Sequence, residues 1–282
     1  MIRKLSAGQI IFRVLAYAVC VLLVIMSIFP FVIMVINATR STPEIQQQTI
    51  SLLPSNHFQS NIDVLEGKSF NAYIGFKNSF IIAAFSTILT LYFSSLTAHA
   101  LVNYSWKLRR PFFTFIMVVM MIPAQITGIG FFQFMYSIGM TNNFLALIIP
   151  TMAAPAGVFF MRQFLIATFP LDLLEAARID GSHEFLTFNR IVLPIMKPAL
   201  ATQGIFAFVT SWNALFMPMV LLTSSNNYTM PLMVNLLRGD IYKTEYGAIY
   251  LALTLTVLPL FAVYFSLSKY IIAGVALGGV KG

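Results

Sequence analysis

Uncharged apolar runs alternate with short polar segments along almost the whole chain. Five runs contain no Asp, Glu, Lys or Arg and are long enough to cross a bilayer: 14–36, 78–102, 111–161, 198–237 and 246–268. A helix needs about 20 apolar residues to cross about 30 Å of hydrocarbon. A charge at the centre of such a helix costs roughly 2.5–3.5 kcal/mol. The pattern therefore predicts membrane-spanning helices.

The run 111–161 is too long for one helix. It divides at Gly139–Met140–Thr141–Asn142–Asn143, where glycine and asparagine favour a turn. Six spans follow, at about 14–36, 78–102, 112–136, 142–161, 199–222 and 246–268. The expected fold class is all-α, a polytopic membrane protein. One transmembrane domain, 14–268, lies between a short N-terminus, 1–13, and a tail, 269–282.

Composition agrees with a membrane protein, since 59% of the 282 residues are hydrophobic and only 9% are charged. The formal net charge of +8 does not indicate nucleic-acid binding, because the cations lie in segments that flank the apolar runs. The expected surface partner is membrane lipid, with no nucleic acid. Cys20 is the single cysteine and cannot form an internal disulfide.

The distribution of lysine and arginine predicts the orientation of the chain. With the N-terminus inside, 12 cations lie inside: Arg3, Lys4, Arg13, Lys107, Arg109, Arg110, Arg162, Arg178, Arg190, Lys197, Lys269 and Lys281. Only 5 lie outside: Arg40, Lys68, Lys77, Arg238 and Lys243. The positive-inside rule favours this orientation. Both termini and the loop 162–197 are then cytoplasmic.

The cytoplasmic loop carries the most closely spaced charges of the chain, from Asp172 to Lys197. Its pattern predicts two short helices. Pro170 suits the first turn of one helix, and Gly181 suits its C-terminal end, where a positive φ is needed. Ser182 is expected to cap the second helix. Pro194 and Pro198 are expected to break that second helix.

The same loop contains EAARIDG, residues 175–181, followed by IVLP, with RQF before it and KPAL after it. This sequence resembles the EAA loop of permease subunits of bacterial ABC importers, and its fuller form resembles the branch that imports sugars. The resemblance implies a coupling helix seated in a cleft of a cytoplasmic ATPase. The residues expected to take part are Glu175, Ala176, Ala177, Asp180, Gly181 and Ser182. The plainer alternative is an ordinary amphipathic loop between membrane helices.

The resemblance covers most of the chain from about Asn78 onward. The tail, which ends Gly278–Gly279–Val280–Lys281–Gly282, is similar to permease tails that extend toward the ATPase, so Lys281 is expected to contribute to coupling. A frayed basic terminus is the alternative. In the maltose-importer relatives the last outer loop reaches toward the substrate-binding protein. By position, this implies binding-protein contact for Asn226, Asn227 and Tyr228.

Polar residues inside the apolar runs are candidates for a substrate path or gate. Gln125 and Gln133 either bond between helices or face a water-filled path. Trp212–Asn213 lies in the fifth span, where the resembling permeases usually have an acidic residue next and this chain has Ala214. An interhelical hydrogen bond explains Asn213 equally well. His99 is either a proton relay or part of a helix interface.

Motifs for catalysis are absent from the sequence. Gly67–Lys68–Ser69 supplies only the end of a nucleotide-binding loop, and Ile62 occupies its first glycine position. No HExxH, paired cysteines or Gly-x-Ser-x-Gly is present. The chain is therefore expected not to be an enzyme and to bind no cofactor. ATP and Mg²⁺ are expected on a partner ATPase.

These observations predict the permease subunit of an ATP-driven, binding-protein-dependent importer for a sugar or oligosaccharide in the bacterial cytoplasmic (inner) membrane. The resemblance implies as partners a second, different permease subunit, two ATP-binding subunits and an extracytoplasmic sugar-binding protein. An importer for a non-sugar solute is the nearest alternative. A stand-alone secondary transporter needs intramembrane ionisable groups, and the spans offer only His99. An intramembrane protease lacks a recognisable nucleophile–base pair.

Overall fold

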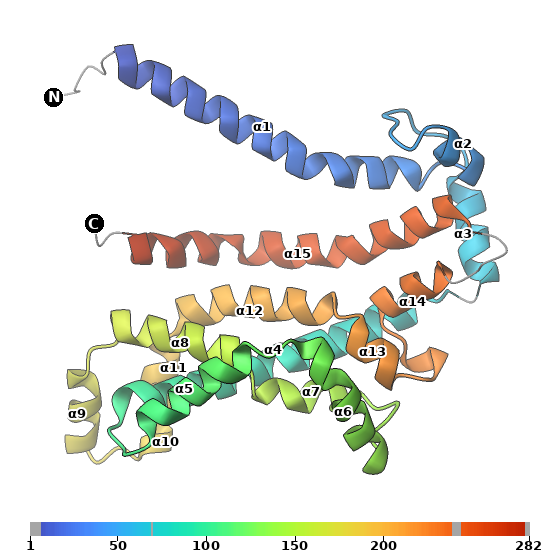
Figure 1. The fold of residues 1–282 in the computed structure, drawn as a ribbon. Coiled ribbons are helices and arrows are strands. Elements are labelled where there is room, and N and C mark those ends of the chain that lie inside the picture. The colour runs from blue at the N-terminus through green and yellow to red at the C-terminus, as the bar shows by residue number, and fades with distance from the viewer. Residues whose placement is uncertain (1–6, 69, 239–243, 280–282) are drawn as a thin grey trace. The chain divides into compact units, whose positions relative to one another are not determined.

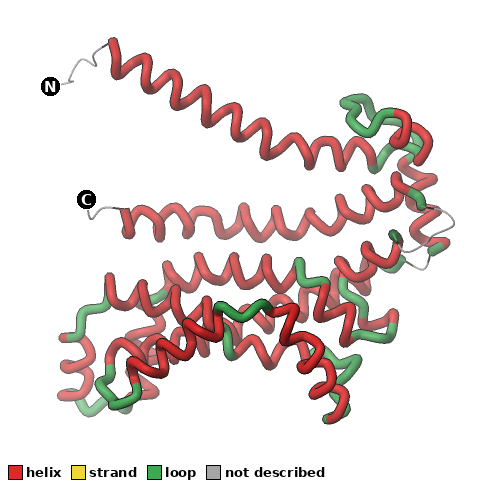
Figure 2. The backbone as a smooth tube through the Cα atoms, viewed as in Figure 1, coloured by secondary structure: helices red, strands yellow, loops and turns green. Residues whose placement is uncertain are grey.

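The computed structural model describes residues 7–68, 70–238 and 244–279, in which helices are joined by loops and turns (Figures 1 and 2). No strand is found in these ranges, so the all-α fold class is confirmed for them. The described residues fall into two compact units. One comprises Met1–Asn71 with Val234–Val257, and the other Ala72–Met233 with Leu258–Gly282.

The first unit contains α1 (Ala7–Asn37), α2 (Thr42–Gln47), α3 (Phe58–Gly67), the end of α14 (Met230–Leu237) and the first part of α15 (Tyr246–Gly279). Arg40 organises its polar loop from a buried position, where only 6% of the residue is exposed. It donates to Asn37 Oδ1 at 3.0 Å and to the carbonyls of Gln48 and Glu44 at 2.7 and 2.9 Å. These bonds satisfy a buried cation that would otherwise be costly.

The second unit contains the remaining helices: α4 (Ala72–Asn103), α5 (Arg109–Met120), α6 (Ala124–Ser137), α7 (Leu145–Ile148), η1 (Ile149–Met152), α8 (Pro155–Thr168), α9 (Asp172–Ile179), α10 (Glu184–Thr187), η2 (Phe188–Val192), α11 (Leu193–Ile195), α12 (Lys197–Trp212), α13 (Phe216–Leu221) and η3 (Ser225–Asn227). Helix α4 packs against both α8 and α12. Figure 1 shows α9 and α10 at one end of this unit, and α6 and α13 at the other.

Small residues allow α4 and α8 to approach each other closely. Ser94, Ser95 and Ala98 of α4 are buried, as expected for residues in a tight helix contact. On the opposing helix, a Cβ atom added to Gly157 would lie 2.5 Å from Ser94 Oγ. Ser94 of α4 and Gly157 of α8 therefore lie at a close helix contact.

Four described helices are long and apolar enough to cross a membrane: Gly8–Asn37, Ala72–Asn103, Leu145–Thr168 and Tyr246–Ser266. Two bent pairs raise the number to as many as six if each pair is one span. They are Arg109–Met120 with Gln125–Ser137, bent by 99°, and Glu184–Ile195 with Lys197–Trp212, bent by 80°. Nearly all side chains of α1 are exposed, which suits a helix whose solvent is lipid.

Two of the predicted spans are therefore not single straight helices. The span predicted at 112–136 is interrupted before α6, where Pro123 has an extended backbone with φ −62° and ψ 127°. Proline lacks the N–H that a continuous helix would use there. The span predicted at 199–222 consists of α12 and α13, which are separated at residues 213–215.

Candidate coupling segment and membrane cavity

Helix α9 begins at Asp172 and holds the EAA residues. Asp172 and Glu175 lie in its first turn and Arg178 lies in its last. This placement of acids and base complements the helix dipole. Pro170 lies just before the helix and not in its first turn. Its carbonyl accepts from Leu173 N at 3.3 Å, and the carbonyl of Leu171 accepts from Leu174 N at 2.9 Å.

Gly181 ends α9 in the conformation that the sequence predicts, with φ at +74°. Two backbone bonds close the helix end. The N–H of Ser182 donates to the carbonyl of Ala177 at 2.9 Å, and the N–H of Gly181 donates to that of Arg178 at 3.0 Å. This pair of bonds is the Schellman arrangement, which requires a left-handed residue at the glycine position.

Ser182 does not cap the second helix, so that expectation is wrong. The residue before α10 is His183, with φ −70° and ψ 139° and no side-chain capping bond. The Ser182 Oγ instead accepts from Thr187 Oγ1 at 2.8 Å. Because the Schellman turn uses the backbone of Ser182, α10 starts one residue later than a serine cap requires.

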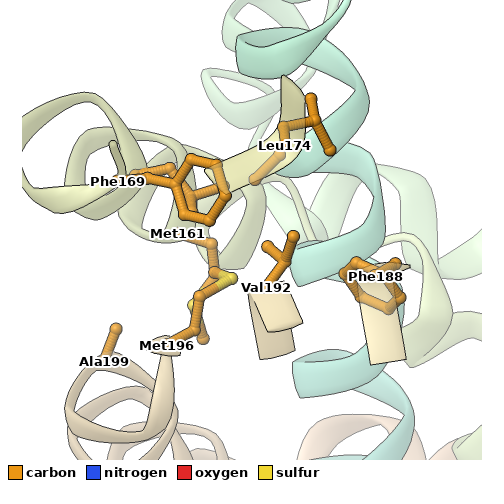
Figure 3. Close-up of a cluster of buried hydrophobic side chains, with 9 residues drawn as sticks. Met161, Phe169, Leu174, Phe188, Val192, Met196 and Ala199 are labelled. Carbon is orange, nitrogen blue, oxygen red and sulfur yellow. The ribbon is translucent and has the colours of Figure 1, made fainter. Parts of the chain in front are cut away.

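One face of α9 packs through apolar side chains against other helices of the second unit. Leu174 is 2% exposed and Ala177 is 5% exposed. Leu174 belongs to a buried cluster that also contains Ala98, Met161, Leu165, Phe169, Phe188, Val192, Met196 and Ala199. Figure 3 shows the side chains of Leu174, Phe169 and Met161 gathered with Val192, Met196 and Ala199. The packing joins α9 to α4, α8 and α12.

The opposite face of α9 is open. Glu175, Ala176, Asp180 and Gly181 are exposed. Of the two adjacent alanines, Ala176 therefore faces outward and Ala177 inward. Apolar side chains accompany the open face: Leu171 is 54% exposed, Leu173 42%, Ile179 86% and Phe185 61%. An apolar face beside exposed charges is typical of a protein-binding surface.

Polar contacts join α9, α10 and the residue after α4. Arg178 Nε donates to Glu184 Oε1 at 3.0 Å, and Tyr104 Oη donates to Glu184 Oε2. The Arg178 guanidinium lies over the Tyr104 ring at 5.3 Å from its centroid. Burial, with Glu184 as a further cause, raises the pKa of Tyr104 to about 12. The Tyr104 hydroxyl and Arg178 lower the pKa of Glu184.

The helix after Glu184 passes through Pro194 without ending. Phe188–Val192 forms a π-helical turn, and α11 continues from Leu193. The break falls at Met196, before Pro198 in the first turn of α12. The helix therefore breaks between the two prolines, with a bend of 80°, although Pro194 itself lies within α11. A π-helical turn pairs residues five apart, so the backbone pairing is already shifted when the chain reaches the proline.

A cavity of about 700 Å³ lies within the second unit, between α4, α6, α8, α12 and their neighbours. Its wall is mainly apolar and includes Ile82, Phe131, Pro150, Phe206 and Met217. Its polar lining residues are Ser86, Thr90, Thr127, Thr151, Gln203, Thr210 and Ser211. An apolar chamber with a few hydroxyl and amide groups is the usual form of a small-molecule site.

The predicted path residues do not line this cavity. Gln125, Gln133 and Asn213 are exposed. Trp212 is 2% exposed and stacks on Phe208 at 5.8 Å between ring centroids. The spacing of polar residues along the sequence could have predicted which of them line the cavity. Ser86 and Thr90 are four apart, and Gln203 and Thr210 are seven apart, so each pair shares a helix face.

The loop with the predicted binding-protein residues is tied down by two asparagines. Asn142, which has φ at +55°, accepts through Oδ1 from the N–H groups of Thr223 and Ser224 at 3.1 and 3.0 Å. Asn78 Nδ2 donates to the carbonyls of Asn226 and Tyr228 at 2.9 and 3.0 Å. Asn227 Nδ2 donates to the carbonyl of Asn142 at 3.0 Å. The loop is therefore held at both ends.

Lys281 lies outside the described residues. Within the described ranges no group of three or more His, Cys, Asp or Glu side chains is placed to hold a metal ion.

Comparison with known proteins identifies the family. The sequence pattern of binding-protein-dependent transport system inner membrane components matches residues 90–276, which is more than half of the chain. The chain belongs to this family. The permease is 33% identical over 258 residues to the arabinooligosaccharides transport system permease protein AraQ of Halalkalibacterium halodurans, covering 91% of this chain and 92% of the relative.

A second relative of the permease is the lactose transport system permease protein LacG of Rhizobium radiobacter, 32% identical, with 95% of this chain and 96% of the relative covered. A solved structure has the same fold with a TM-score of 0.79 at 23% identity, covering 95% of this chain and 99% of the other. It belongs to a bacterial ABC transporter involved in the import of the acidic polysaccharide alginate. The permease is therefore a transport component and not an enzyme.

Proposed function

We propose that this permease is one of two membrane subunits of an ATP-driven importer for a sugar or an oligosaccharide. The solute class is supported by relatives named for arabinooligosaccharides and lactose. The open face of α9 is the observation that carries the proposal. It presents Glu175 and Ala176 to a partner, while Leu174 anchors the helix to the membrane unit.

The chain crosses the bacterial cytoplasmic membrane six times with both termini and α9 inside. The excess of lysine and arginine in the inner segments supports this orientation. The pair Arg109–Met120 with Gln125–Ser137 is taken as one span. Helix α12 with α13 is taken as another, so that Glu184–Ile195 stays in the cytoplasmic loop. The domain 14–268, with its cytoplasmic loop 162–197, then forms half of the transport path, and the second permease forms the other half.

Two partner subunits bind ATP and Mg²⁺ and hydrolyse the nucleotide. Their closure moves α9, and the apolar cluster around Leu174 passes the movement to α4, α8 and α12. Glu175 pairs with a cation on the ATPase, while Asp180, Gly181 and Ser182 fix the end of the coupling helix. Truncating one member of a desolvated charge pair costs about 2–5 kcal/mol, which is enough to uncouple the complex. Lys281 contributes a further contact to the ATPase.

The substrate passes along the cavity between α4 and α12. The serine and threonine hydroxyl groups that line the cavity, and the amide of Gln203, suit hydrogen bonding to sugar hydroxyls. Gln125, Gln133, Trp212 and Asn213 remain candidates for neighbouring parts of the path. On the outer side, Asn226, Asn227 and Tyr228 receive the sugar-binding protein.

The proposal is tested by purifying the tagged chain from membranes in mild detergent and measuring uptake in cells. A second permease and an ATPase are expected to co-purify in roughly one-to-one-to-two proportion. Glu175→Lys should leave membrane insertion intact but abolish uptake and weaken ATPase binding. Asp63→Lys is the matched control, because Asp63 lies in the predicted outer loop and is bonded to Gln59 there.

A chain that purifies alone and transports when reconstituted alone contradicts the proposal and favours a secondary transporter. Normal uptake with Glu175→Lys contradicts the coupling role of α9. The solute is identified by screening the co-encoded binding protein against sugars and other small solutes. Binding only of a non-sugar solute overturns the sugar assignment and leaves the importer assignment intact.

A further inference from the structure

A chain of polar side chains links the end of α4 to the coupling segment. It runs from Asn103 through His99 and Tyr104 to Glu184 and Arg178. Asn103 Nδ2 lies 2.6 Å from His99 Nδ1, and Tyr104 Oη lies 3.3 Å from His99 Nε2. Tyr104 donates to Glu184, which also accepts from Arg178. Tyr104 and Glu184 are 80 residues apart in the sequence.

The donor and acceptor groups of these side chains determine the direction of each hydrogen bond in the series. The carboxylate of Glu184 only accepts, so the single hydroxyl proton of Tyr104 is committed to it. The Tyr104 oxygen must then accept from His99, which places the ring proton on Nε2. The other ring nitrogen, Nδ1, is left to accept from the amide of Asn103. Every bond therefore has one donor and one acceptor, and no two groups compete for the same role.

The chain meets α4 close to its cytoplasmic end. Helix α4 runs without interruption from Ala72 to Asn103, and its residues Ile82, Ser86 and Thr90 line the cavity. His99 is nine residues from Thr90, or about 14 Å along the helix axis. The ring of His99 also lies 5.4 Å from that of Phe188, which belongs to the apolar cluster under α9. The coupling segment is thus attached to α4 both by polar side chains and by the apolar cluster.

We propose that the chain His99–Tyr104–Glu184–Arg178, here called the latch, holds the coupling segment in register with α4, so that movement of α9 is transmitted to the α4 wall of the cavity. The inference rests on the proposed function, since it concerns how ATP hydrolysis drives transport. Tyr104 and Glu184 are positioning residues, because neither touches the cavity. The apolar cluster supplies adhesion, whereas the directional bonds of the latch fix the rotation of α10 relative to α4.

The test uses the full complex in liposomes, with the binding protein and a radiolabelled substrate, and measures substrate molecules transported per ATP hydrolysed. Tyr104→Phe removes one oxygen and keeps the ring under Arg178. Tyr73→Phe is the matched control, because Tyr73 is 75% exposed and lies at the other end of α4. Tyr104→Phe removes a hydrogen bond to a charged group, so transport per ATP is expected to fall at least about tenfold. Tyr73→Phe is expected to leave it unchanged.

Glu184→Gln is the second variant, and the double variant with Tyr104→Phe is the third. If both residues act through one bond, the double variant loses no more transport per ATP than the worse single variant. ATPase co-purification should match that of the unchanged protein. The loss of transport per ATP should persist at temperatures far below the thermal midpoint of each variant, where a merely stabilising contact has no effect. The latch is refuted if the unchanged complex couples ATP to uptake and both single variants couple equally well. A failure of the unchanged chain to bind an ATPase instead refutes the proposed function.

Discussion

Gly157 of α8 lies directly against Ser94 of α4. A Cβ atom on Gly157 would lie 2.5 Å from Ser94 Oγ, 3.2 Å from Ser94 Cβ and 3.4 Å from Thr90 Cγ2. All of these atoms are on one helix that is rigidly packed, so little room is available for adjustment. The contact sets the separation of two helices that both line the cavity.

Gly157→Ala is expected to destabilise the permease by about 1–3 kcal/mol, because it overpacks this contact. Ser94→Ala removes the nearest oxygen and should restore part of the loss in the double variant. The thermal midpoint of the purified complex measures both effects. The matched control is Gly130→Ala, since a Cβ atom at Gly130 meets no atom within 4 Å. Equal effects of Gly157→Ala and Gly130→Ala would show that the close contact is unimportant.

Gly181 tests whether backbone conformation or space governs the end of the coupling helix. No atom lies within 4 Å of a Cβ atom added there, so size alone causes no clash within this chain. A left-handed conformation costs an ordinary residue about 1–2 kcal/mol. Gly181→Ala should therefore lower uptake, while Gly181→Asn, which tolerates that conformation, should retain more of it. Uptake measured at equal membrane abundance decides the point, and a worse result for asparagine would favour a steric explanation.

Gln203 and Gln133 are a matched pair for the substrate path. Gln203 lines the cavity, whereas Gln133 is exposed and does not. Removing one hydrogen bond to a substrate costs about 0.5–1.5 kcal/mol, so Gln203→Leu should raise the substrate concentration for half-maximal uptake up to about tenfold. Basal ATP hydrolysis should not change. An effect from Gln133→Leu and none from Gln203→Leu would move the path away from this cavity.

The Asn142 side chain accepts hydrogen bonds from the outer loop that begins at Thr223, and its own backbone is left-handed. Asn142→Asp keeps both properties, Asn142→Gly keeps only the backbone, and Asn142→Ala keeps neither. Each lost bond is worth about 1 kcal/mol. The concentration of binding protein needed for half-maximal stimulation of ATP hydrolysis should therefore rise in the order aspartate, glycine, alanine. Any other order would separate the loop from binding-protein contact.

The contact between Glu184 and Tyr104 predicts a pH dependence of stability. Since the pKa of Glu184 is lowered in the folded protein, its contribution is complete above the ordinary value of 4.5 and is lost as the pH falls through the lowered value. The pKa of Tyr104 is raised from 10.0 to about 12, so its contribution is complete below 10 and is lost as the pH rises through 12. The thermal midpoint of Glu184→Gln should therefore lie below that of the unchanged protein by a constant amount between these limits.

The difference in midpoint should shrink in acid, where both proteins lack the carboxylate charge. The control is the same comparison in a Tyr104→Phe background. There the acid-dependent change should be smaller, because the Tyr104 hydroxyl is the main cause of the lowered pKa of Glu184. A midpoint difference that does not depend on pH would exclude a contribution from the Glu184 charge.

The sequence predicts those features that depend on neighbours in the chain. The left-handed conformation of Gly181 follows from local backbone chemistry and is found. The apolar runs likewise predict the long helices. Ser182 and Pro194 show the limit of local rules, because a Schellman turn and a π-helical turn on either side of α10 change which residue caps and which residue breaks the helix.

Features that depend on distant partners could not be predicted. Ser94 and Gly157 are separated by most of two spans. The sequence around either residue does not indicate that the other is its contact partner. The place of Trp212 beside Asn213 in the fifth span predicts a role in the substrate path, yet its ring is packed against Phe208 in the core. The cavity was missed because serine and threonine are common in membrane helices, although their spacing on α4 and α12 carried the signal.

The Schellman turn at Gly181 has a consequence for the energetics of assembly. Helix α9 is ended by its own backbone bonds and is held on one side by Leu174. Its open face therefore has its final shape before any other subunit arrives. A surface that is ordered in advance loses less conformational entropy on association, so more of the contact energy remains for affinity. In the proposed importer, this helix of eight residues would form a rigid joint between the permease and the ATPase.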